Sequence, residues 1–209
     1  MPRARADDSE TSSTKKAWLG KLLLAGWVIV TLAGLAFLSL GHIAAMPAPD
    51  GEARLTRELL ALRRDPSRSF FVHVIYAGCS CTERLFGHLT GRARFPGADE
   101  LVLFVGEDPA KRLSAERAGL RFVTASPSDL AARYGIEAAP VLIAFDAAGR
   151  LRYLGGYYNH PSTIFPLDEK IHAQLAQGAA PQPLPVFGCA VSPRLQDSVD
   201  PFGIVYRRS

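Results

Sequence analysis

Two cysteines separated by one residue, Cys79 and Cys81, stand where thiol chemistry is favoured. They directly follow the apolar run 69–77 and precede a segment with helical spacing, so they lie between a strand and a helix. The N–H groups and the dipole at a helix start stabilise a thiolate, the reactive form of cysteine as nucleophile and as metal ligand. Two such cysteines can form and break a disulfide by exchange with a partner.

The spacing of this pair predicts a reactive disulfide. Only Ser80 separates the two sulfurs, so the ring that a Cys79–Cys81 disulfide closes is short. Strain in a short ring makes a disulfide easier to reduce and hence more oxidising. A reduction potential below about −300 mV would contradict this expectation. The alternative is a pair of unreactive loop thiols.

The third cysteine, Cys189, lies in an apolar segment of the C-terminal tail. It is a buried inert side chain, a third redox thiol beside the pair, or a ligand that completes a metal site. Soft thiolates select copper(I) or zinc, and His88 and His160 are the candidate histidines for such a site. His73, inside the apolar run 69–77, is expected to be a hydrogen-bonded core residue, and His172 a helix-surface residue.

Hydrophobic periodicity predicts an α/β fold around these cysteines. The run 69–77 is apolar throughout, which is typical of a central strand buried on both faces. Ser126 followed by Pro127 predicts a helix start. Strands are expected at 69–77, 100–105, 121–125, 141–145 and 151–155, and helices at 52–64, 82–89, 109–118, 127–134 and 167–177. This order implies a mixed sheet flanked by helices, parallel at first, with an antiparallel hairpin.

The segment 129–156 carries a resemblance to a known family. It reads as a helix ending at Tyr134-Gly135, then Ala139-Pro140 before an apolar strand, a turn and a second strand. With the strand–cysteine–helix arrangement, the pattern over about residues 69–177 resembles the thioredoxin superfamily, most closely membrane-anchored TlpA/ResA-like thiol-disulfide oxidoreductases. The resemblance implies a thioredoxin-like fold with a cis proline, matched by Pro140, against the active-site cysteines.

The cysteine motif departs from the family pattern. The family motif is W-C-x-x-C, whereas this chain reads G-C-S-C-T over residues 78–82. Either Cys79 aligns with the first family cysteine or Cys81 aligns with the second. Because Cys79 is closest to the strand end, it is the expected attacking nucleophile, with Cys81 as the resolving thiol. Cys79, Cys81 and Pro140 form the expected site, and no cofactor is implied because the cysteines are the redox centre.

The same resemblance carries the main alternative function. Some thioredoxin-like relatives of the Sco type deliver copper with two cysteines and a histidine. A copper-binding protein would use Cys79, Cys81 and either a histidine or Cys189. Those relatives have a C-x-x-x-C spacing, which this chain lacks. A thioredoxin-like scaffold without exchange activity is the third possibility.

A nearly uncharged apolar segment lies near the N-terminus. The run from Leu22 to Leu40 spans about 19 residues, enough for one bilayer crossing. By the positive-inside rule, the basic N-terminus stays in the cytoplasm and the chain after about residue 42 is exported. Cleavage as a signal peptide near Ala44 and Ala45 is the alternative, but the run exceeds the roughly 7–15 apolar residues of a signal core. The basic residues before the run are Arg3, Arg5, Lys15, Lys16 and Lys21, and the first after it is Arg54.

Composition excludes some other functions. The net charge is only +4, and the chain lacks the density of basic and aromatic residues expected of a nucleic-acid surface. Arg92 and Arg94 are expected to be solvated. Segment 106–108 lacks the lysine and the spacing of a phosphate-binding loop.

These observations predict an exported, single-pass protein of a bacterial-type inner membrane whose domain faces the periplasmic, oxidising side. Its partner is expected to be a protein thiol or disulfide, with the membrane bound through one helix and no nucleic acid involved. The expected parts are a cytoplasmic segment 1–17, a transmembrane helix 18–41, a linker 42–51, a thioredoxin-like domain 52–178 and a tail 179–209 packed on the domain.

Overall fold

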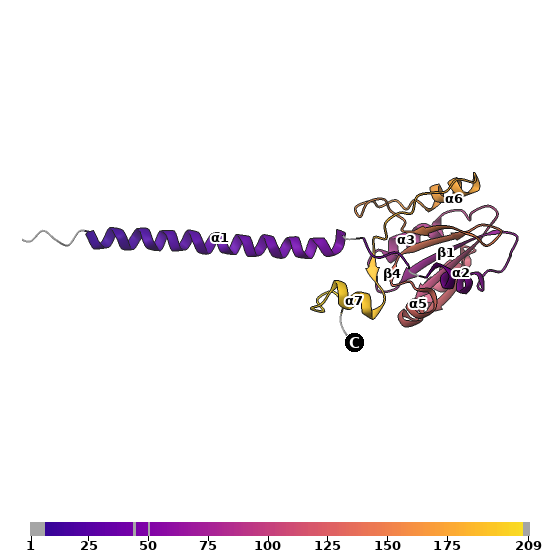
Figure 1. Ribbon diagram of the computed structural model, residues 1–209, viewed down its shortest axis with the longest axis horizontal. Coiled ribbons are helices and arrows are strands. Elements are labelled where there is room, and N and C mark those ends of the chain that lie inside the picture. Colours follow the sequence, from indigo (N-terminus) through magenta and orange to yellow (C-terminus); the bar gives the residue numbers. More distant parts are fainter. Residues whose placement is uncertain (1–6, 44, 50, 207–209) are drawn as a thin grey trace, which may run out of the picture. The chain divides into compact units, whose positions relative to one another are not determined.

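The computed structural model describes residues 7–43, 45–49 and 51–206 (Figure 1). Arg3, Arg5 and the candidate cleavage residue Ala44 lie outside these ranges. The chain divides into two compact units at His42. The first contains helix α1 (Asp7–Ile43) up to His42, and the second contains the mixed sheet, its helices and the C-terminal tail.

Helix α1 contains the apolar segment expected from the sequence. Its part Trp18–Ala36 is long and apolar enough to cross a membrane, and none of it is buried within the protein. Large apolar side chains such as Leu23 and Trp27 are exposed along it. A signal sequence near the N-terminus can meet the same criteria of length and composition, so the uncleaved anchor stays a prediction.

A five-stranded sheet forms the centre of the second unit, in the order β3-β2-β1-β5-β6. Strand β1 lies in the middle, parallel to β2 and antiparallel to β5, and β2 is parallel to β3. The five strands are those predicted: β1 (Ser69–Tyr76), β2 (Ala98–Val105), β3 (Arg121–Ala125), β5 (Val141–Phe145) and β6 (Leu151–Gly155). Six of the eight β1 residues are buried, which confirms a strand covered on both faces.

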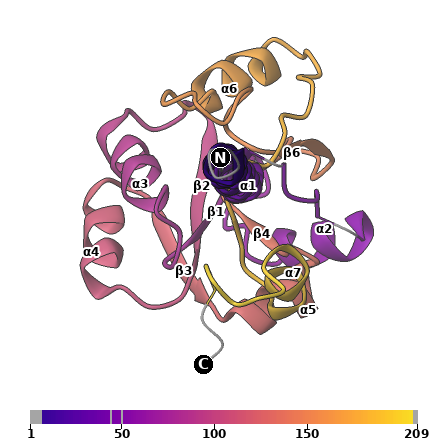
Figure 2. The same cartoon turned by 90° about the vertical axis from the view of Figure 1, so that its left-hand side faces the viewer.

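Helices cover both faces of this sheet (Figure 2). Phe71 and Ile75 of β1 pack in the core beneath α3, α4 and α6, while Phe70, Val72 and Val74 pack in the core beneath α2, α5 and α7. Successive side chains of a strand point to opposite faces, so one apolar strand supplies both cores. The helices are α2 (Glu52–Leu60), α3 (Thr82–Gly91), α4 (Pro109–Arg117), α5 (Pro127–Tyr134), α6 (Asp168–Ala176) and α7 (Pro193–Val199).

The helix starts follow local capping chemistry. Ser126 accepts a hydrogen bond from Asp129 N–H at 3.0 Å, with Pro127 in the first turn, as the sequence predicts for α5. Ser192 caps the unpredicted helix α7 in the same way, accepting from Leu195 N–H at 3.1 Å. Together, the mixed sheet and the helices that flank it form a thioredoxin-like α/β fold.

A second, two-stranded sheet was not predicted. Strand β4 (Ala138–Ala139) pairs antiparallel with β7 (Cys189–Ala190), and nearby Met46 forms an isolated bridge with Val186. Two-residue strands are too short to produce a periodic pattern, so only the folded chain reveals them. The pairing attaches the C-terminal tail to the segment that precedes Pro140.

Candidate functional site

The cysteine loop joins the carboxyl end of β1 to the start of α3. Cys79 N–H donates to Tyr76 O at 3.1 Å, and Thr82 N–H donates to Cys79 O at 3.0 Å. Cys81 is the residue just before α3, and its carbonyl accepts from Leu85 N–H at 3.2 Å. Both sulfur-bearing residues therefore lie at a helix start, where a thiolate is stabilised.

Three thiols meet at this loop. Cys79 Sγ lies 2.8 Å from Cys81 Sγ and 2.7 Å from Cys189 Sγ, and all three cysteines are free. The sequence left three roles open for Cys189: an inert buried side chain, a redox thiol or a metal ligand. Its direct contact with Cys79 places it in the candidate site, although 110 residues separate the two in the chain.

Strand pairing and a glycine bring Cys189 to the site. Cys189 pairs with Ala139 in the β4–β7 register. The preceding residue, Gly188, lies so close to β4 that a Cβ there would meet Ala139 O at 2.0 Å and Pro140 Cδ at 2.6 Å. Only glycine allows this approach. On the other side of β7, Ala190 N–H donates to Tyr206 Oη at 2.8 Å.

Pro140 lies beside the end of the strand that leads into the cysteine loop. The Ala139–Pro140 peptide bond is cis, as the family resemblance implies. The antiparallel register pairs Val141 with Val74, so Pro140 lies beside the last residues of β1, from which the cysteine loop continues. Its participation in the site stays a prediction.

The thiols differ in how readily they ionise. A hydrogen bond from the Cys79 thiol lowers the pKa of Cys81, against the effect of burial. For Cys79, the hydrogen bond from Cys189 lowers the pKa, but the contact with Cys81 and burial outweigh it and raise the pKa to about 12. The bond to Cys79 and burial raise the pKa of Cys189. Cys81 is therefore the thiol that ionises most readily of the three.

The exposure of the two side chains also favours Cys81 as the more reactive thiol. Cys79 is buried, with 5% of its surface exposed, whereas Cys81 is partly exposed. A partner disulfide reaches an exposed thiolate more easily than a buried thiol. Both properties favour Cys81 as the attacking sulfur and Cys79 as the resolving one, the reverse of the order expected from the sequence.

The histidines considered as metal ligands have other contacts. His88 Nε2 lies 2.8 Å from Asp168 Oδ1, and His160 Nδ1 lies 2.7 Å from Ser162 Oγ. Across residues 7–43, 45–49 and 51–206, no group of three or more His, Cys, Asp or Glu side chains has the arrangement to hold a metal ion.

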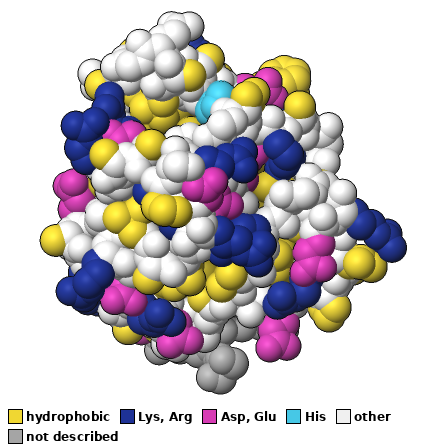
Figure 3. Space-filling model, turned by 90° about the vertical axis from the view of Figure 1, so that its right-hand side faces the viewer, with side chains coloured by type: hydrophobic (Ala, Val, Ile, Leu, Met, Phe, Trp, Pro, Cys, Tyr) yellow, Lys and Arg dark blue, Asp and Glu magenta, His cyan; other side chains and the backbone are white. Residues whose placement is uncertain are grey.

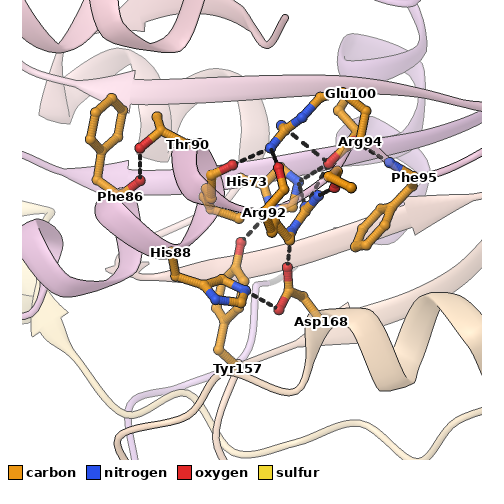
Figure 4. A network of polar contacts seen from close by, with 12 residues as sticks. His73, Phe86, His88, Thr90, Arg92, Arg94, Phe95, Glu100, Tyr157 and Asp168 are labelled. Atoms are coloured by element: carbon orange, nitrogen blue, oxygen red, sulfur yellow. Dashed lines mark hydrogen bonds and ion pairs between the residues drawn. The ribbon is translucent and has the colours of Figure 1, made fainter. Parts of the chain in front are cut away.

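A buried polar network holds the other end of α3 (Figure 4). Arg92, just after the helix, donates to Glu100 Oε2 at 2.6 Å and to Asp168 Oδ2 at 2.8 Å. His73 lies 2.7 Å from Tyr157 Oη through Nδ1 and 3.4 Å from Glu100 Oε2 through Nε2. The expectation that His73 is a hydrogen-bonded core residue is confirmed. The expectation that Arg92 is solvated is wrong, because 5% of its side chain is exposed and two buried carboxylates pair with it.

Burial and pairing determine the charges in this network. Burial opposes ionisation of Glu100, but hydrogen bonds from His73 and Arg92 outweigh it and lower the carboxyl pKa. Burial lowers the pKa of His73, so its ring is neutral near pH 7. Sequence analysis missed this network, although Glu100 and His73 are polar residues inside apolar strands.

The other surface features lie apart from the thiols. A cavity of about 270 Å³ is lined by Ser69 and Phe71, at the end of β1 opposite the cysteine loop. His172, expected on a helix surface, is partly buried and stacks on Phe95 with ring centres 4.2 Å apart. On the face shown in Figure 3, basic and acidic side chains lie beside one another.

The strand order, the cis proline and the thiols before α3 together define a thioredoxin-like domain with a candidate thiol site. No protein-family profile and no curated protein matches the chain.

Several solved structures are similar to this one. An uncharacterized conserved protein from Geobacillus kaustophilus is 18% identical, covering 60% of this chain and 77% of its own, with a TM-score of 0.49. A hypothetical protein from Sinorhizobium meliloti 1021 is 18% identical, covering 72% and 91%, with a TM-score of 0.48. The thioredoxin domain of a thiol-disulfide oxidoreductase from Bacteroides vulgatus is 19% identical, covering 41% and 68%, with a TM-score of 0.32.

Proposed function

We propose that this protein is a membrane-anchored thiol-disulfide oxidoreductase that exchanges disulfides with a protein partner through Cys79 and Cys81. The observation that carries the proposal is the contact between the two sulfurs, 2.8 Å apart at the start of α3. Cys81 supplies a partly exposed thiol of lowered pKa, and Cys79 supplies a buried thiol beside it. That combination suits attack followed by resolution.

Exchange proceeds in two balanced steps. The Cys81 thiolate attacks one sulfur of a partner disulfide, a Cys81–partner bond forms, and the other partner sulfur leaves as a thiolate. Cys79 then loses its proton and attacks Cys81 Sγ. A Cys79–Cys81 disulfide forms, and the second partner sulfur leaves and takes up a proton. Each step is reversible, so the partner's reduction potential sets the direction.

Trapping of the mixed disulfide tests this proposal. In Cys79→Ser, Cys81 can attack but Cys79 cannot resolve, so a covalent partner complex should accumulate in cells. It should disappear when reductant is added before electrophoresis. Cys81→Ser/Cys189→Ser tests attack by Cys79 with both contacting thiols removed. Cys79→Ser/Cys81→Ser is the control and should trap nothing; no complex with either test variant would refute the proposal.

The anchor and the outer location belong to the same proposal. The apolar segment Trp18–Ala36 and the basic residues before it support a single-pass protein of the inner membrane whose domain lies on the periplasmic side. The intact protein should stay with membranes after alkaline carbonate washing. Its domain should be degraded by protease added to spheroplasts. Release by carbonate as a shortened chain would instead show a cleaved signal peptide.

Copper binding is the competing function, and metal analysis separates it from exchange. Anaerobically purified, reduced protein is expected to contain far less than one copper per chain. Stoichiometric copper that is lost in Cys79→Ser would favour a copper carrier, because Cys79 is the thiol that contacts both others.

A further inference from the structure

We propose that Cys189 is a third redox residue, which takes the disulfide over from Cys81 and leaves Cys81 free as a thiol. The protein would then store its oxidised state as a Cys79–Cys189 disulfide. This inference rests on the proposed exchange function and adds an internal acceptor to it.

The first support is the contact between the thiols. Cys189 Sγ lies 2.7 Å from Cys79 Sγ, which is as close as the 2.8 Å between Cys81 Sγ and Cys79 Sγ. An inert buried cysteine packs as a small apolar side chain. Cys189 instead is partly exposed and donates its thiol proton toward Cys79.

The second support is the way the tail holds Cys189 in place. Pairing with Ala139 fixes the strand register, and the Gly188 approach to Pro140 leaves no room for displacement toward β4. Upstream, Met46 N–H donates to Val186 O at 2.8 Å. The third thiol is therefore held against the segment before the cis proline, by strand pairing and by close packing.

The third support is a pair of polar groups near the Cys189 sulfur. The Ser80 N–H and the Tyr206 hydroxyl both act to lower the pKa of Cys189, although burial and the Cys79 contact keep that pKa raised. Tyr206 is itself positioned by Asp200. The carboxylate of Asp200 accepts from the N–H groups of Ile204 at 2.9 Å, Val205 at 2.7 Å and Tyr206 at 2.8 Å.

The transfer step conserves atoms and electrons. Cys189 releases its proton to solvent and attacks Cys79 Sγ of the Cys79–Cys81 disulfide. A Cys79–Cys189 bond forms, the Cys79–Cys81 bond breaks, and Cys81 leaves as a thiolate. Cys79 Sγ contacts both other sulfurs, so it can be attacked by Cys189 while Cys81 leaves. The chain stays oxidised by two electrons throughout.

Peptide mapping tests the proposal directly. Trypsin places Cys79 and Cys81 together in peptide 69–84 and Cys189 in peptide 171–194. Full-length protein is equilibrated with glutathione and glutathione disulfide, blocked with N-ethylmaleimide and digested without reductant. The expected product is peptide 69–84 linked to 171–194, with the blocking group on Cys81.

Matched variants identify the sulfurs. Cys81→Ser should keep the linked pair of peptides, because Cys79 and Cys189 are both present. Cys79→Ser should reduce the linked pair at least about tenfold, because it removes the sulfur that contacts Cys189. Tyr206→Phe removes the hydroxyl that acts to lower the Cys189 pKa and should slow formation of the linked pair several-fold, and circular dichroism would verify that the variant is folded.

Two results overturn the inference. One is an internal disulfide within peptide 69–84 with Cys189 blocked at every glutathione ratio, and the other is no linked pair in Cys81→Ser. Both would leave the proposed exchange function intact as long as the mixed disulfide is trapped. A linked pair without any trapped partner would refute the exchange function and leave the internal transfer standing.

Discussion

At the scale of single residues, the three cysteines differ because their neighbours differ. Cys81 receives a hydrogen bond from Cys79 and is partly exposed, whereas Cys79 is buried between two thiols. The thiolate is the reactive form of cysteine, so in the proposed exchange these contacts favour Cys81 as the first sulfur to react. Position relative to the strand end, the criterion available from the sequence, favoured the other cysteine.

Removing the donor to Cys81 should make it less reactive. Cys79→Ala deletes the hydrogen bond that is the largest cause of the lowered Cys81 pKa, so that pKa should rise. At pH 7 the thiolate fraction of Cys81 should fall about tenfold for each unit of increase, so alkylation by iodoacetamide should become slower, by a smaller factor because the remaining thiolate is more nucleophilic. The measurement is the pH profile of alkylation at Cys81 by mass spectrometry.

Cys189→Ala is the control, because it leaves the Cys79–Cys81 contact in place. Because Cys189 acts to raise the Cys81 pKa, the Cys81 profile of this variant should stay in place or move to lower pH, and not to higher pH. An unchanged profile in Cys79→Ala would show that the contact does not activate Cys81.

At the scale of elements, the site is built where three segments meet. The end of β1, the start of α3 and the paired strands β4 and β7 each contribute a part of it. Strand β7 depends on Gly188, and α3 depends on Arg92 at its far end. Each dependence can be tested with a substitution away from the sulfurs.

Gly188→Ala should separate β7 from β4. Its Cβ would lie 2.0 Å from Ala139 O, a backbone atom, so one strand must move. Cross-linking of Cys79 to Cys189 should fall about tenfold or more, with a loss of about 1–3 kcal/mol in unfolding free energy. Non-reducing peptide mapping and denaturant unfolding measure the two effects.

Gly87→Ala is the matched control on α3, because nothing lies within 4 Å of the added Cβ. It should preserve the cross-link and leave stability equal or higher by about 0.5–1 kcal/mol. Equal cross-linking in Gly188→Ala and the wild-type chain would disprove the role of the close approach.

Arg92→Ala should destabilise the domain. It leaves the buried carboxylates of Glu100 and Asp168 without the cation that pairs with both. Loss of one partner of a buried ion pair costs about 3–5 kcal/mol. Urea unfolding measures the change, and exposed Arg117→Ala, expected within about 0.5 kcal/mol of wild type, is the control.

At the scale of the whole molecule, the buried network links stability to pH. The folded state holds His73 neutral because burial lowers its pKa below the ordinary value. Below about pH 6.5 the unfolded chain binds a proton at this residue that the folded chain does not. Stability must therefore fall as pH decreases through this range. The carboxyl pKa of Glu100 is also lowered, so its stabilising contribution is lost only at more acidic pH.

His73→Gln should reduce the slope of stability against pH between 5 and 7.5. The loss approaches about 1.4 kcal/mol per pH unit where the proton difference is complete. Some slope should persist, because partial burial also lowers the pKa of His172. Thermal unfolding across this pH range is the measurement. Exposed His160→Gln should keep the wild-type slope, and an equal slope in His73→Gln would contradict the assignment.

The sequence by itself determined the elements and the chemistry they carry. Apolar periodicity and helix caps depend on neighbouring residues, so the five sheet strands, the helices from α2 to α6 and the apolar segment of α1 were all readable. The C-x-C pair at a strand–helix junction was equally local. The proline expected to be cis came from a local family pattern and is cis in the structure.

Only the tertiary structure decided which distant residues meet. Cys189 reaches Cys79 through two-residue strands and a glycine contact, and Arg92 pairs with Glu100 and Asp168 from two other elements. Such contacts join segments far apart in sequence, so the local spacing of apolar residues does not predict them. The order of reaction among the thiols depends on burial and hydrogen bonding after folding, so spacing alone could not predict it.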